Sequence, residues 1–409
     1  MKKYQILMGF LVLITVVCWL LTPTVAATSS MIRFSQLLGA LSLLGLASLC
    51  FIATRSSLVD TLFEGMDKSY QIHKWLGAIS VILVVAHINT IDAQSDGGPG
   101  WPSFILFLLL TLFALLSRRL NYETWKTAHK LLLLPYIIGL VHYYTDSDYA
   151  VFAPTFFSLW LNLINITGIV AAFYSVFFYE KTAFPFQFRV AEVTPVAVGT
   201  IEFTGKRKNY SGRNPKYTPG QFAFVKFPWL SPQFPSHPFT ISGSFTGDMV
   251  QFTVKNLGDH TAKLVETLKP GDEFLVSQPC GRFNYQNGCC RQIWIAGGIG
   301  ITPFRSFWQA GILQGFSIDL FYAYNSESEG AYLEELKAWP PDERLRIHLI
   351  DYTISGFLTA EHIKDCIDAD EKADIYFCGP KPMLKSLRRQ LNSGLQIGKW
   401  HNEEFQFRY

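Results

Sequence analysis

The chain has 409 residues, 49% of them hydrophobic and 16% charged, and its formal net charge is +3. This composition excludes intrinsic disorder and a small disulfide scaffold, and the near-neutral charge without lysine- and arginine-rich runs gives no support to nucleic-acid binding. Only 19 of the 67 charged residues (35 basic and 32 acidic) fall in the first 180 positions. The apolar first part rules out a wholly cytosolic enzyme.

Apolar runs of membrane-spanning length follow one another through this first part. A bilayer core of about 30 Å needs about 20 apolar residues in a helix. We predict six spans, at roughly Tyr4–Leu21, Phe34–Thr54, Tyr70–Thr90, Trp101–Leu116, Thr124–Tyr143 and Val151–Tyr179. The first run also fits a signal peptide, because two lysines precede it and small residues follow it.

Basic residues are sorted to one set of connections. They stand at the amino end and in the second and fourth connections: Lys2, Lys3, Arg55, Lys68, Lys74, Arg118, Arg119, Lys126 and Lys130. The opposite connections carry Asp92, Asp96, Asp146 and Asp148, with Arg33 as their one basic residue. Because basic loops stay in the cytoplasm, we expect a multi-pass protein of the cell membrane. Both termini, and everything after Glu180, are expected to be cytoplasmic.

Four of the nine histidines lie inside two predicted spans, His73 and His87 in the third and His129 and His142 in the fifth. Ionisable residues inside a membrane mark functional sites, although a single histidine can also serve as an interhelical hydrogen-bonding group. The two histidines of one helix are separated by about 20 Å along that helix. The two helices together therefore predict two stacked sites: His73 with His129 near the cytoplasmic face, and His87 with His142 near the outer face.

The chemistry of these pairs favours one kind of metal centre. Two imidazoles without a membrane carboxylate or thiolate fit axial ligation of a b-type haem better than a zinc or di-iron centre. One difficulty is geometric, since a spacing of 13 residues turns His129 and His142 about 140° apart on a straight helix. We predict a helix distortion near Pro135 that turns His142 toward the site.

From about Ala183 the pattern changes to short alternating runs that are typical of an antiparallel barrel. The predicted strands are Val190–Glu202, Gln221–Phe227, Met249–Lys255 and Glu273–Ser277. The segment His237-Pro238-Phe239-Thr240-Ile241-Ser242-Gly243 alternates polar and aromatic side chains, which suits a flavin ring and its phosphate chain, or an ordinary strand entry. Gly258-Asp259-His260-Thr261 then precedes a helical pattern from Ala262 to Leu268. A helix amino terminus there would bind pyrophosphate, or Asp259 merely caps the helix.

From about Cys290 strands alternate with helices. The strand Ile293–Ala296 leads into Gly297-Gly298-Ile299-Gly300-Ile301-Thr302-Pro303 and a helix predicted over Phe304–Gln314. A buried strand, a glycine loop and a helix form the usual setting for a dinucleotide phosphate, although the glycine spacing differs from G-x-G-x-x-G. A second strand, Asp374–Phe377, ends in Cys378-Gly379-Pro380.

In this order, the four histidines, His237–Thr240, Gly297–Pro303 and Cys378–Pro380 resemble the ferric reductase and NADPH oxidase family, most closely the short prokaryotic NADPH oxidases. The resemblance covers nearly the whole chain. It implies a multidomain membrane protein with a six-helix transmembrane haem bundle at 1–180. A ferredoxin-reductase-like β-barrel FAD domain would follow at 183–285, and an α/β NAD(P)H-binding domain at 290–409.

The resemblance also implies roles for matching positions. FAD would contact His237, Pro238, Phe239, Thr240, Ser242, Gly258, Asp259, His260 and Thr261. The nicotinamide nucleotide, NADPH or NADH, would lie on Gly297, Gly298, Gly300, Thr302, Pro303, Gly379 and Pro380, with Cys378 near the position of hydride transfer. In the ending Glu403-Glu404-Phe405-Gln406-Phe407, the ring of Phe405, or else Phe407, would cover the flavin until nicotinamide displaces it. A terminal ring merely packed on the domain is the alternative.

Two departures from the family pattern bear on specificity and control. No arginine for a 2'-phosphate follows the second nucleotide-domain strand, which continues through Tyr324-Asn325-Ser326 to Glu327. Glu327 would repel such a phosphate, which favours NADH. No calcium-binding loop is present, so we expect no control by calcium.

The resemblance implies an NAD(P)H oxidase that passes electrons from cytoplasmic NAD(P)H through FAD and two b haems to dioxygen, which yields superoxide. With a ferric chelate as acceptor the same path makes a metal reductase, and the acidic outer connections would attract such ions. A non-enzymatic transporter or receptor with a regulatory cytoplasmic half is the alternative from another class. A component that feeds electrons to an extracytoplasmic repair enzyme is a third. Membrane lipid is the expected surrounding, and no protein partner is required.

Overall fold

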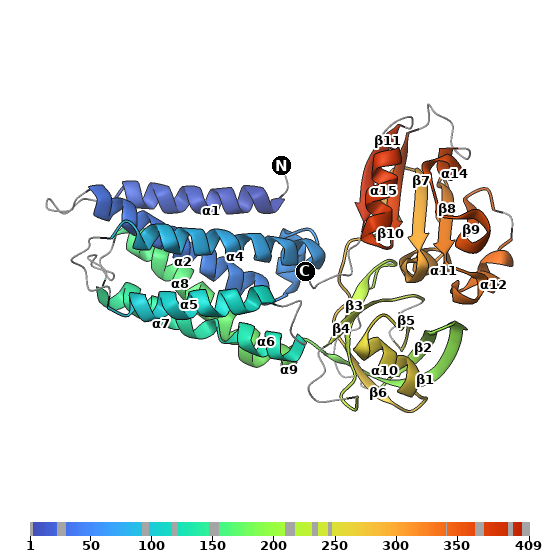
Figure 1. Cartoon of the computed structure of the whole chain (residues 1–409), viewed down its shortest axis with the longest axis horizontal. Coiled ribbons are helices and arrows are strands. Elements are labelled where there is room, and N and C mark those ends of the chain that lie inside the picture. The colour runs from blue at the N-terminus through green and yellow to red at the C-terminus, as the bar shows by residue number, and fades with distance from the viewer. Residues whose placement is uncertain are drawn as a thin grey trace. The chain divides into compact units, whose positions relative to one another are not determined.

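A computed structural model describes residues 3–22, 30–91, 98–116, 122–146, 155–208, 217–230, 236–243, 248–340, 342–364, 372–391 and 396–402. The chain divides into two compact units, with the boundary between Thr182 and Ala183. The first unit is helical and the second combines two sheets with short helices (Figure 1).

Helices make up the described part of the first unit. They are α1 (Lys3–Leu20), α2 (Ser30–Ala53), α3 (Ser57–Leu62), α4 (Met66–Ile88), α5 (Gly100–Leu115), α6 (Tyr122–Lys130), α7 (Leu133–Asp146), α8 (Phe156–Phe173), the π-helical turn η2 (Tyr174–Phe178) and α9 (Tyr179–Thr182). Among the described residues, four helical stretches are long and apolar enough to cross a membrane: Lys3–Leu20, Ser30–Ala53, Lys68–Ile88 and Phe156–Thr182. The predicted fourth span, Trp101–Leu116, corresponds to the shorter apolar helix α5, and the predicted fifth span is divided between α6 and α7. A bundle of six spans therefore stays a prediction.

The break between α6 and α7 lies just before Pro135. A proline has no N–H to donate and its ring collides with the carbonyl four residues earlier. The amides of Leu131 and Leu132 instead bond to the carbonyls of Ala128 and His129, three residues back, each at 3.1 Å. The carbonyl of Pro135 accepts a hydrogen bond of 2.8 Å from Ser103 Oγ, which ties α7 to α5. The predicted distortion is therefore present, and a continuous helix over Thr124–Tyr143 is wrong.

Helix α2 packs against both α4 and α8, and α5 packs against α7 (Figure 1). Small residues such as Ala40 and Ala47 are buried on α2 and let its neighbours approach closely. Large apolar side chains instead face outward on the other helices, for example Ile82 and Leu115, which are 66% and 71% exposed. Such an outer surface suits lipid tails rather than water.

The second unit begins with a six-stranded antiparallel sheet in the order β4-β3-β6-β1-β2-β5. Its elements are β1 (Phe186–Ala197), β2 (Thr200–Arg207), β3 (Phe222–Lys226), β4 (His237–Thr240), β5 (Met249–Lys255), β6 (Glu273–Val276) and the helix α10 (Asp259–Thr267). The two edge strands meet at a bridge between Ile241 and Phe252. The predicted strand Val190–Glu202 is corrected, because the chain reverses between β1 and β2 and the alternation of buried and exposed residues simply continues on the far side of the turn.

A five-stranded parallel sheet in the order β11-β10-β7-β8-β9 completes the second unit. Its strands are β7 (Arg291–Gly297), β8 (Ser317–Tyr324), β9 (Leu345–Asp351), β10 (Ala373–Cys378) and β11 (Ile397–Asn402). The helices are α11 (Thr302–Gln309), α12 (Leu333–Lys337), α13 (Tyr352–Ser355), α14 (Ala360–Lys364) and α15 (Lys381–Leu391), with the 3-10 turns η3 (Tyr285–Asn287), η4 (Gly298–Ile301) and η5 (Glu327–Glu329). The predicted helix Phe304–Gln314 is too long, because α11 stops at Gln309 and Gly311, a poor helix former, follows.

Helices cover both faces of the parallel sheet. Alternate residues of β7 belong to different clusters, since Trp294 and Ala296 pack with α11 and α12 while Ile293 and Ile295 pack with α14 and α15. This alternation follows from the two-residue period of a strand. The carboxyl ends of the strands are thereby left at one edge of the sheet, where ligands bind in such folds.

Candidate functional site

The four membrane histidines form two pairs of neighbouring rings, whose planes are inclined by 56° and 62° to each other. The ring centres of His73 on α4 and His129 on α6 are 6.1 Å apart, and those of His87 on α4 and His142 on α7 are 6.5 Å apart. A metal–imidazole bond is about 2 Å long, and the ring centre lies about 1 Å beyond the bonded nitrogen. Two imidazoles bound on opposite sides of one metal therefore have ring centres about 6 Å apart. Both pairs therefore fit two axial ligands of one iron atom, and the break before Pro135 is what brings α7 and His142 to the second pair.

Residues of α2 orient the two histidines of α4. Nδ1 of His87 lies 2.8 Å from the backbone oxygen of Ser35 and 3.0 Å from its Oγ. His73 has a backbone hydrogen bond with Leu49. A metal-binding histidine commonly donates its other ring N–H to such a carbonyl, which fixes the ring and its tautomer. For His87 this leaves Nε2 as the nitrogen that would hold iron.

The sequence interpretation missed Ser35 and Leu49. Both contact the histidines through backbone groups, which every residue has, so their residue types gave no signal. The ring of His129 also stacks on Trp125, with 5.1 Å between ring centres.

Glycines give the outer pair its room. A Cβ at Gly39 would lie 3.3 Å from the ring of His87, and a Cβ at Gly100 would lie 3.0 Å from the ring of His142. A larger side chain at Gly100 would displace the ring of His142.

Basic residues surround the other pair. The guanidinium of Arg55 lies 5.2 Å from the ring centre of Tyr70 and 5.1 Å from that of Tyr179. Lys126, one turn before His129, forms an ion pair of 2.7 Å with Glu180. The end of the helical unit that carries His73 and His129 is therefore the end where the basic residues gather.

The predicted flavin segment forms the edge strand β4. His237, Pro238 and Phe239 are partly exposed along it, whereas Thr240 is buried. The imidazole of His237 stacks on that of His260, at the start of α10, with 3.7 Å between ring centres. The structure thus brings the two predicted flavin motifs together at one place.

The hydroxyl groups of these motifs are already engaged. Thr261 Oγ1 donates to the carbonyl of Gly258 and accepts from the amide of Leu257. Ser242 is fully buried, and its hydroxyl accepts a hydrogen bond of 2.8 Å from Thr253. Ser242 therefore lies inside the unit, away from any surface that a flavin would reach, while the amino end of α10 stays open beside Gly258.

The stacked imidazoles predict an acid-sensitive fold. Burial, together with the neighbouring His237, lowers the pKa of His260 to about 3, whereas an unfolded histidine titrates near about 6.5. Between these values the unfolded chain binds the extra proton, so the free energy of unfolding falls as the pH drops below about 6.5. We expect the thermal midpoint of the second unit to fall less between about pH 7 and about pH 5 in His260→Gln than in the unmodified chain. Thermal unfolding followed by protein fluorescence at both pH values measures this, with His362→Gln as control; equal slopes in all three proteins would contradict it.

The predicted nucleotide loop follows β7 and meets the turn after β10. A Cβ at Gly300 would lie 2.1 Å from the carbonyl oxygen of Cys378, and a Cβ at Gly379 would lie 3.1 Å from Gly297. Backbone therefore packs directly on backbone, which only glycine permits. Gly298 has a φ of 54°, and a Cβ there would meet nothing within 4 Å. The loop thus combines a tightly packed underside with open space above Gly298, where a phosphate would fit.

The other predicted nucleotide residues lie beneath this surface. Thr302 and Pro303 are buried in the first turn of α11, and Thr302 Oγ1 donates to the carbonyl of Ile299 at 3.1 Å. Cys378 is 1% exposed at the end of β10, while Gly379 and Pro380 are more open. Phe405 and Phe407 lie outside the described residues.

A lysine that the sequence interpretation missed lies beside Glu327. Lys337, on α12, forms an ion pair with Glu327 and another of 3.4 Å with Glu334. The predicted repulsion of a 2'-phosphate by Glu327 is therefore partly offset by a neighbouring cation. Lys337 is distant in sequence from the end of β8, so the local pattern gave no signal for it.

This pair predicts how the nucleotide preference will respond to substitution. Glu327→Gln is expected to lower KM for NADPH about two- to five-fold, because Lys337 loses its ion pair with Glu327 and can interact with a 2'-phosphate. This range corresponds to the energy of one exposed ion pair. KM for NADH should stay within about two-fold, since NADH has no such phosphate. Steady-state kinetics with both nucleotides measures this. The gain should disappear in Glu327→Gln/Lys337→Met, and a gain that persists there would contradict the assignment.

The chain matches three protein families in succession. Residues 38–140 match the family described as ferric reductase like transmembrane component, residues 185–288 match an FAD-binding domain, and residues 294–389 match an oxidoreductase NAD-binding domain. The first match contains His73, His87 and His129, and the other two contain the predicted flavin and nucleotide motifs.

Curated relatives match either the second unit or most of the chain. The ferredoxin reductase component of 3-ketosteroid-9-alpha-monooxygenase from Rhodococcus rhodochrous is 26% identical over 196 residues, 46% of this chain and 56% of that protein. A superoxide-generating NADPH oxidase heavy chain from Dictyostelium discoideum is 23% identical over 362 residues, 70% of this chain and 66% of that protein. The chain spans about half the length of the first curated relatives it matches.

Among solved structures, the ferredoxin reductase in carbazole 1,9a-dioxygenase is 18% identical with a TM-score of 0.43, covering 54% of this chain and 69% of that chain. A ferredoxin NADP+ reductase from Neisseria gonorrhoeae with bound FAD and NADP is 18% identical with a TM-score of 0.44, covering 53% and 97%. The three family matches in their order, together with the NADPH oxidase relative, confirm the resemblance drawn from the motifs. In all three regions, the chain is similar to the ferric reductase and NADPH oxidase family.

Proposed function

We propose that the chain is a membrane oxidoreductase that moves electrons from cytoplasmic NAD(P)H, by way of FAD and two b-type haems, to an acceptor on the other side of the membrane. One observation carries the proposal. Two facing histidine pairs are stacked along α4, each with the ring separation of two ligands on one metal, in a chain that also matches FAD- and NAD-binding domains.

FAD, when bound, would accept the two electrons of a hydride and release them singly, and each haem would carry one electron at a time. The chain's own residues would hold and orient these groups. His73 and His129 would hold one haem iron, and His87 and His142 would hold the other. With two protein ligands on each iron, the haems would carry electrons rather than bind a substrate.

The orientation rests on the basic residues. Arg55, Lys68, Lys74 and Lys126 gather at the end of the helical unit that carries His73 and His129, which by the positive-inside rule is the cytoplasmic end. Electrons would therefore enter at the pair of His73 and His129 and leave at the pair of His87 and His142.

Dioxygen is the acceptor that we propose, with superoxide as product. The likeness to the superoxide-generating oxidase of Dictyostelium discoideum over 70% of the chain supports it. A ferric chelate is the second candidate, because residues 38–140 match a family named for ferric reductase. Both acceptors would use the same internal path.

Full-length protein in detergent, loaded with haem and FAD, separates these acceptors. The visible spectrum should show six-coordinate b haem and flavin, and both should be reduced when NADH or NADPH is added without oxygen. Superoxide release in air, measured with and without ferric citrate, then identifies the acceptor. Fast ferric reduction without oxygen consumption would contradict the oxidase proposal. Purified protein without haem absorbance would favour the transporter or receptor alternative.

A further inference from the structure

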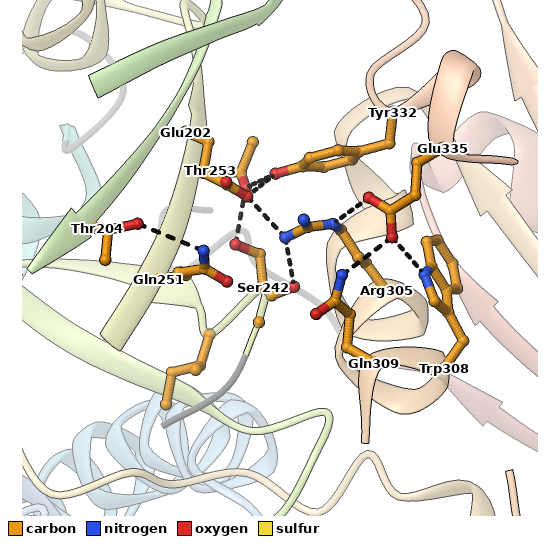
Figure 2. A network of polar contacts seen from close by, with 12 residues as sticks. Glu202, Thr204, Ser242, Gln251, Thr253, Arg305, Trp308, Gln309, Tyr332 and Glu335 are labelled. Carbon is orange, nitrogen blue, oxygen red and sulfur yellow. Dashed lines mark hydrogen bonds and ion pairs between the residues drawn. The ribbon is translucent and has the colours of Figure 1, made fainter. Parts of the chain in front are cut away.

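A buried polar network joins the flavin-binding part of the second unit to its nucleotide-binding part (Figure 2). Its centre is Arg305, in the first turn of α11, whose side chain is only 8% exposed. The guanidinium bonds to Glu202 on β2 at 2.6 Å and to Glu335 on α12 at 2.9 Å. It also donates to the backbone carbonyl of Ser242 at 3.2 Å. One side chain thus contacts β2, the segment after β4 and α12 at once.

Tyr332 closes the network on its other side. Its ring centre lies 4.1 Å from the guanidinium of Arg305, its hydroxyl donates to Glu202 at 2.7 Å, and the same hydroxyl contacts Thr253 on β5. Burial raises the pKa of Tyr332 well above its usual range, so the hydroxyl keeps its proton. The backbone of Tyr332 has a φ of 63°, a left-handed conformation that a tyrosine rarely adopts. Such strain is kept where surrounding contacts demand a particular position.

Each of two network residues lies close in sequence to one of the two predicted ligand sites. Arg305 follows Thr302, which ends the glycine loop, by three residues, and Ser242 follows Thr240 of the flavin segment by two. Further contacts hold the same boundary, since Ser306 Oγ accepts from the amide of Gly220 at 2.7 Å and Lys255 pairs with Glu329 at 3.1 Å. A buried ion pair adds little stability over apolar packing, but it fixes geometry.

We propose that Arg305 is a positioning residue for hydride transfer, which holds the nucleotide loop at the start of α11 in fixed register with the flavin segment after β4. The inference rests on the proposed reduction of FAD by a nicotinamide nucleotide. Hydride transfer requires the reacting atoms about 3–3.5 Å apart, and a displacement of about 1 Å can slow a reaction about 100-fold. Arg305 would act on the reaction through the two backbones that it joins.

The test is the rate of flavin reduction in the full-length, FAD-loaded protein, mixed rapidly with NADH without oxygen. We expect Arg305→Lys and Glu202→Gln to slow flavin reduction about 10- to 100-fold, while the FAD content and the dissociation constant of NADH stay within about two-fold. The long-wavelength absorbance of the nicotinamide–flavin complex should weaken in parallel. Glu273→Gln is the matched control, because it removes an exposed carboxylate that pairs with Arg189 and Lys208 outside the network, and it should reduce flavin at the unmodified rate.

Tyr332→Phe tests the same network with a smaller change, in case Arg305→Lys or Glu202→Gln does not fold. It removes one hydroxyl, keeps the ring and should also slow flavin reduction. Flavin reduction at the unmodified rate in Glu202→Gln and Tyr332→Phe would overturn the inference. So would a loss of FAD or NADH affinity without a change of rate, which a merely structural role predicts. If the unmodified chain itself is not reduced by NADH or NADPH, the proposed function fails instead.

Discussion

The variant His129→Ala is expected to keep flavin reduction by NADH and to lose electron delivery to dioxygen or ferric citrate. The ring of His129 lies 6.1 Å from that of His73 between centres, so under the proposed function its removal would leave one haem iron with a single protein ligand. Substitution of a residue that only orients a metal ligand lowers metal affinity or activity about 10- to 100-fold. Loss of a ligand itself should lower them further. The haem content should fall from two per chain toward one, measured from the spectrum of the denatured protein.

Two comparisons make this prediction specific. His362→Ala removes a histidine on α14, in the second unit, and should change neither haem content nor acceptor reduction. Imidazole added to His129→Gly should partly restore both, because a free ring can occupy the space of the deleted one. Unchanged haem content in His129→Ala would show that this histidine does not hold iron.

The variant Gly300→Ala is expected to lose NADH binding by more than about ten-fold and to lower the thermal stability of the second unit. Its Cβ would lie 2.1 Å from the carbonyl oxygen of Cys378, and neither atom belongs to a flexible side chain. Overpacking of this kind costs about 1–3 kcal/mol, and the loop after β7 and the turn after β10 must separate to relieve it. Titration of the flavin absorbance with NADH and thermal unfolding by flavin fluorescence measure the two effects.

The control for Gly300→Ala is Gly9→Ala in α1, where the new Cβ meets nothing within 4 Å. This variant should match the unmodified chain in both measurements. Normal NADH binding by a folded Gly300→Ala would mean that the nucleotide does not need the close contact between Gly300 and Cys378.

Element types were largely predictable from the sequence, whereas their ends were not. The predicted strand Met249–Lys255 has the bounds of β5, and the strand at Ile293–Ala296 lies within β7, because alternation and β-branched residues act locally. The turn between β1 and β2 was not predicted, because the hydrophobic alternation resumes directly after it. The early end of α11 follows from Gly311, a poor helix former that lies inside the predicted range.

The candidate sites divide in the same way. Residue type and spacing alone singled out His73, His87, His129 and His142, since ionisable groups are costly in lipid wherever they occur. The sequence also determined the break near Pro135, which follows from the missing N–H of proline. Ser35, Lys337 and Arg305 were not predicted by the same reasoning, because each meets a partner that lies in another element, ten or more residues away in the chain.

The sequence by itself thus determined the family, the order of the three regions and the residues with unusual chemistry, because composition, periodicity and motif order are local properties of the chain. The tertiary structure alone decided how closely the paired histidine rings approach, at 6.1 and 6.5 Å between ring centres, and how Gly300 packs on Cys378. It also decided that Arg305 joins β2, the segment after β4 and α12 through a buried guanidinium. Such contacts arise between segments far apart in sequence, and they depend on packing that every part of a unit determines together.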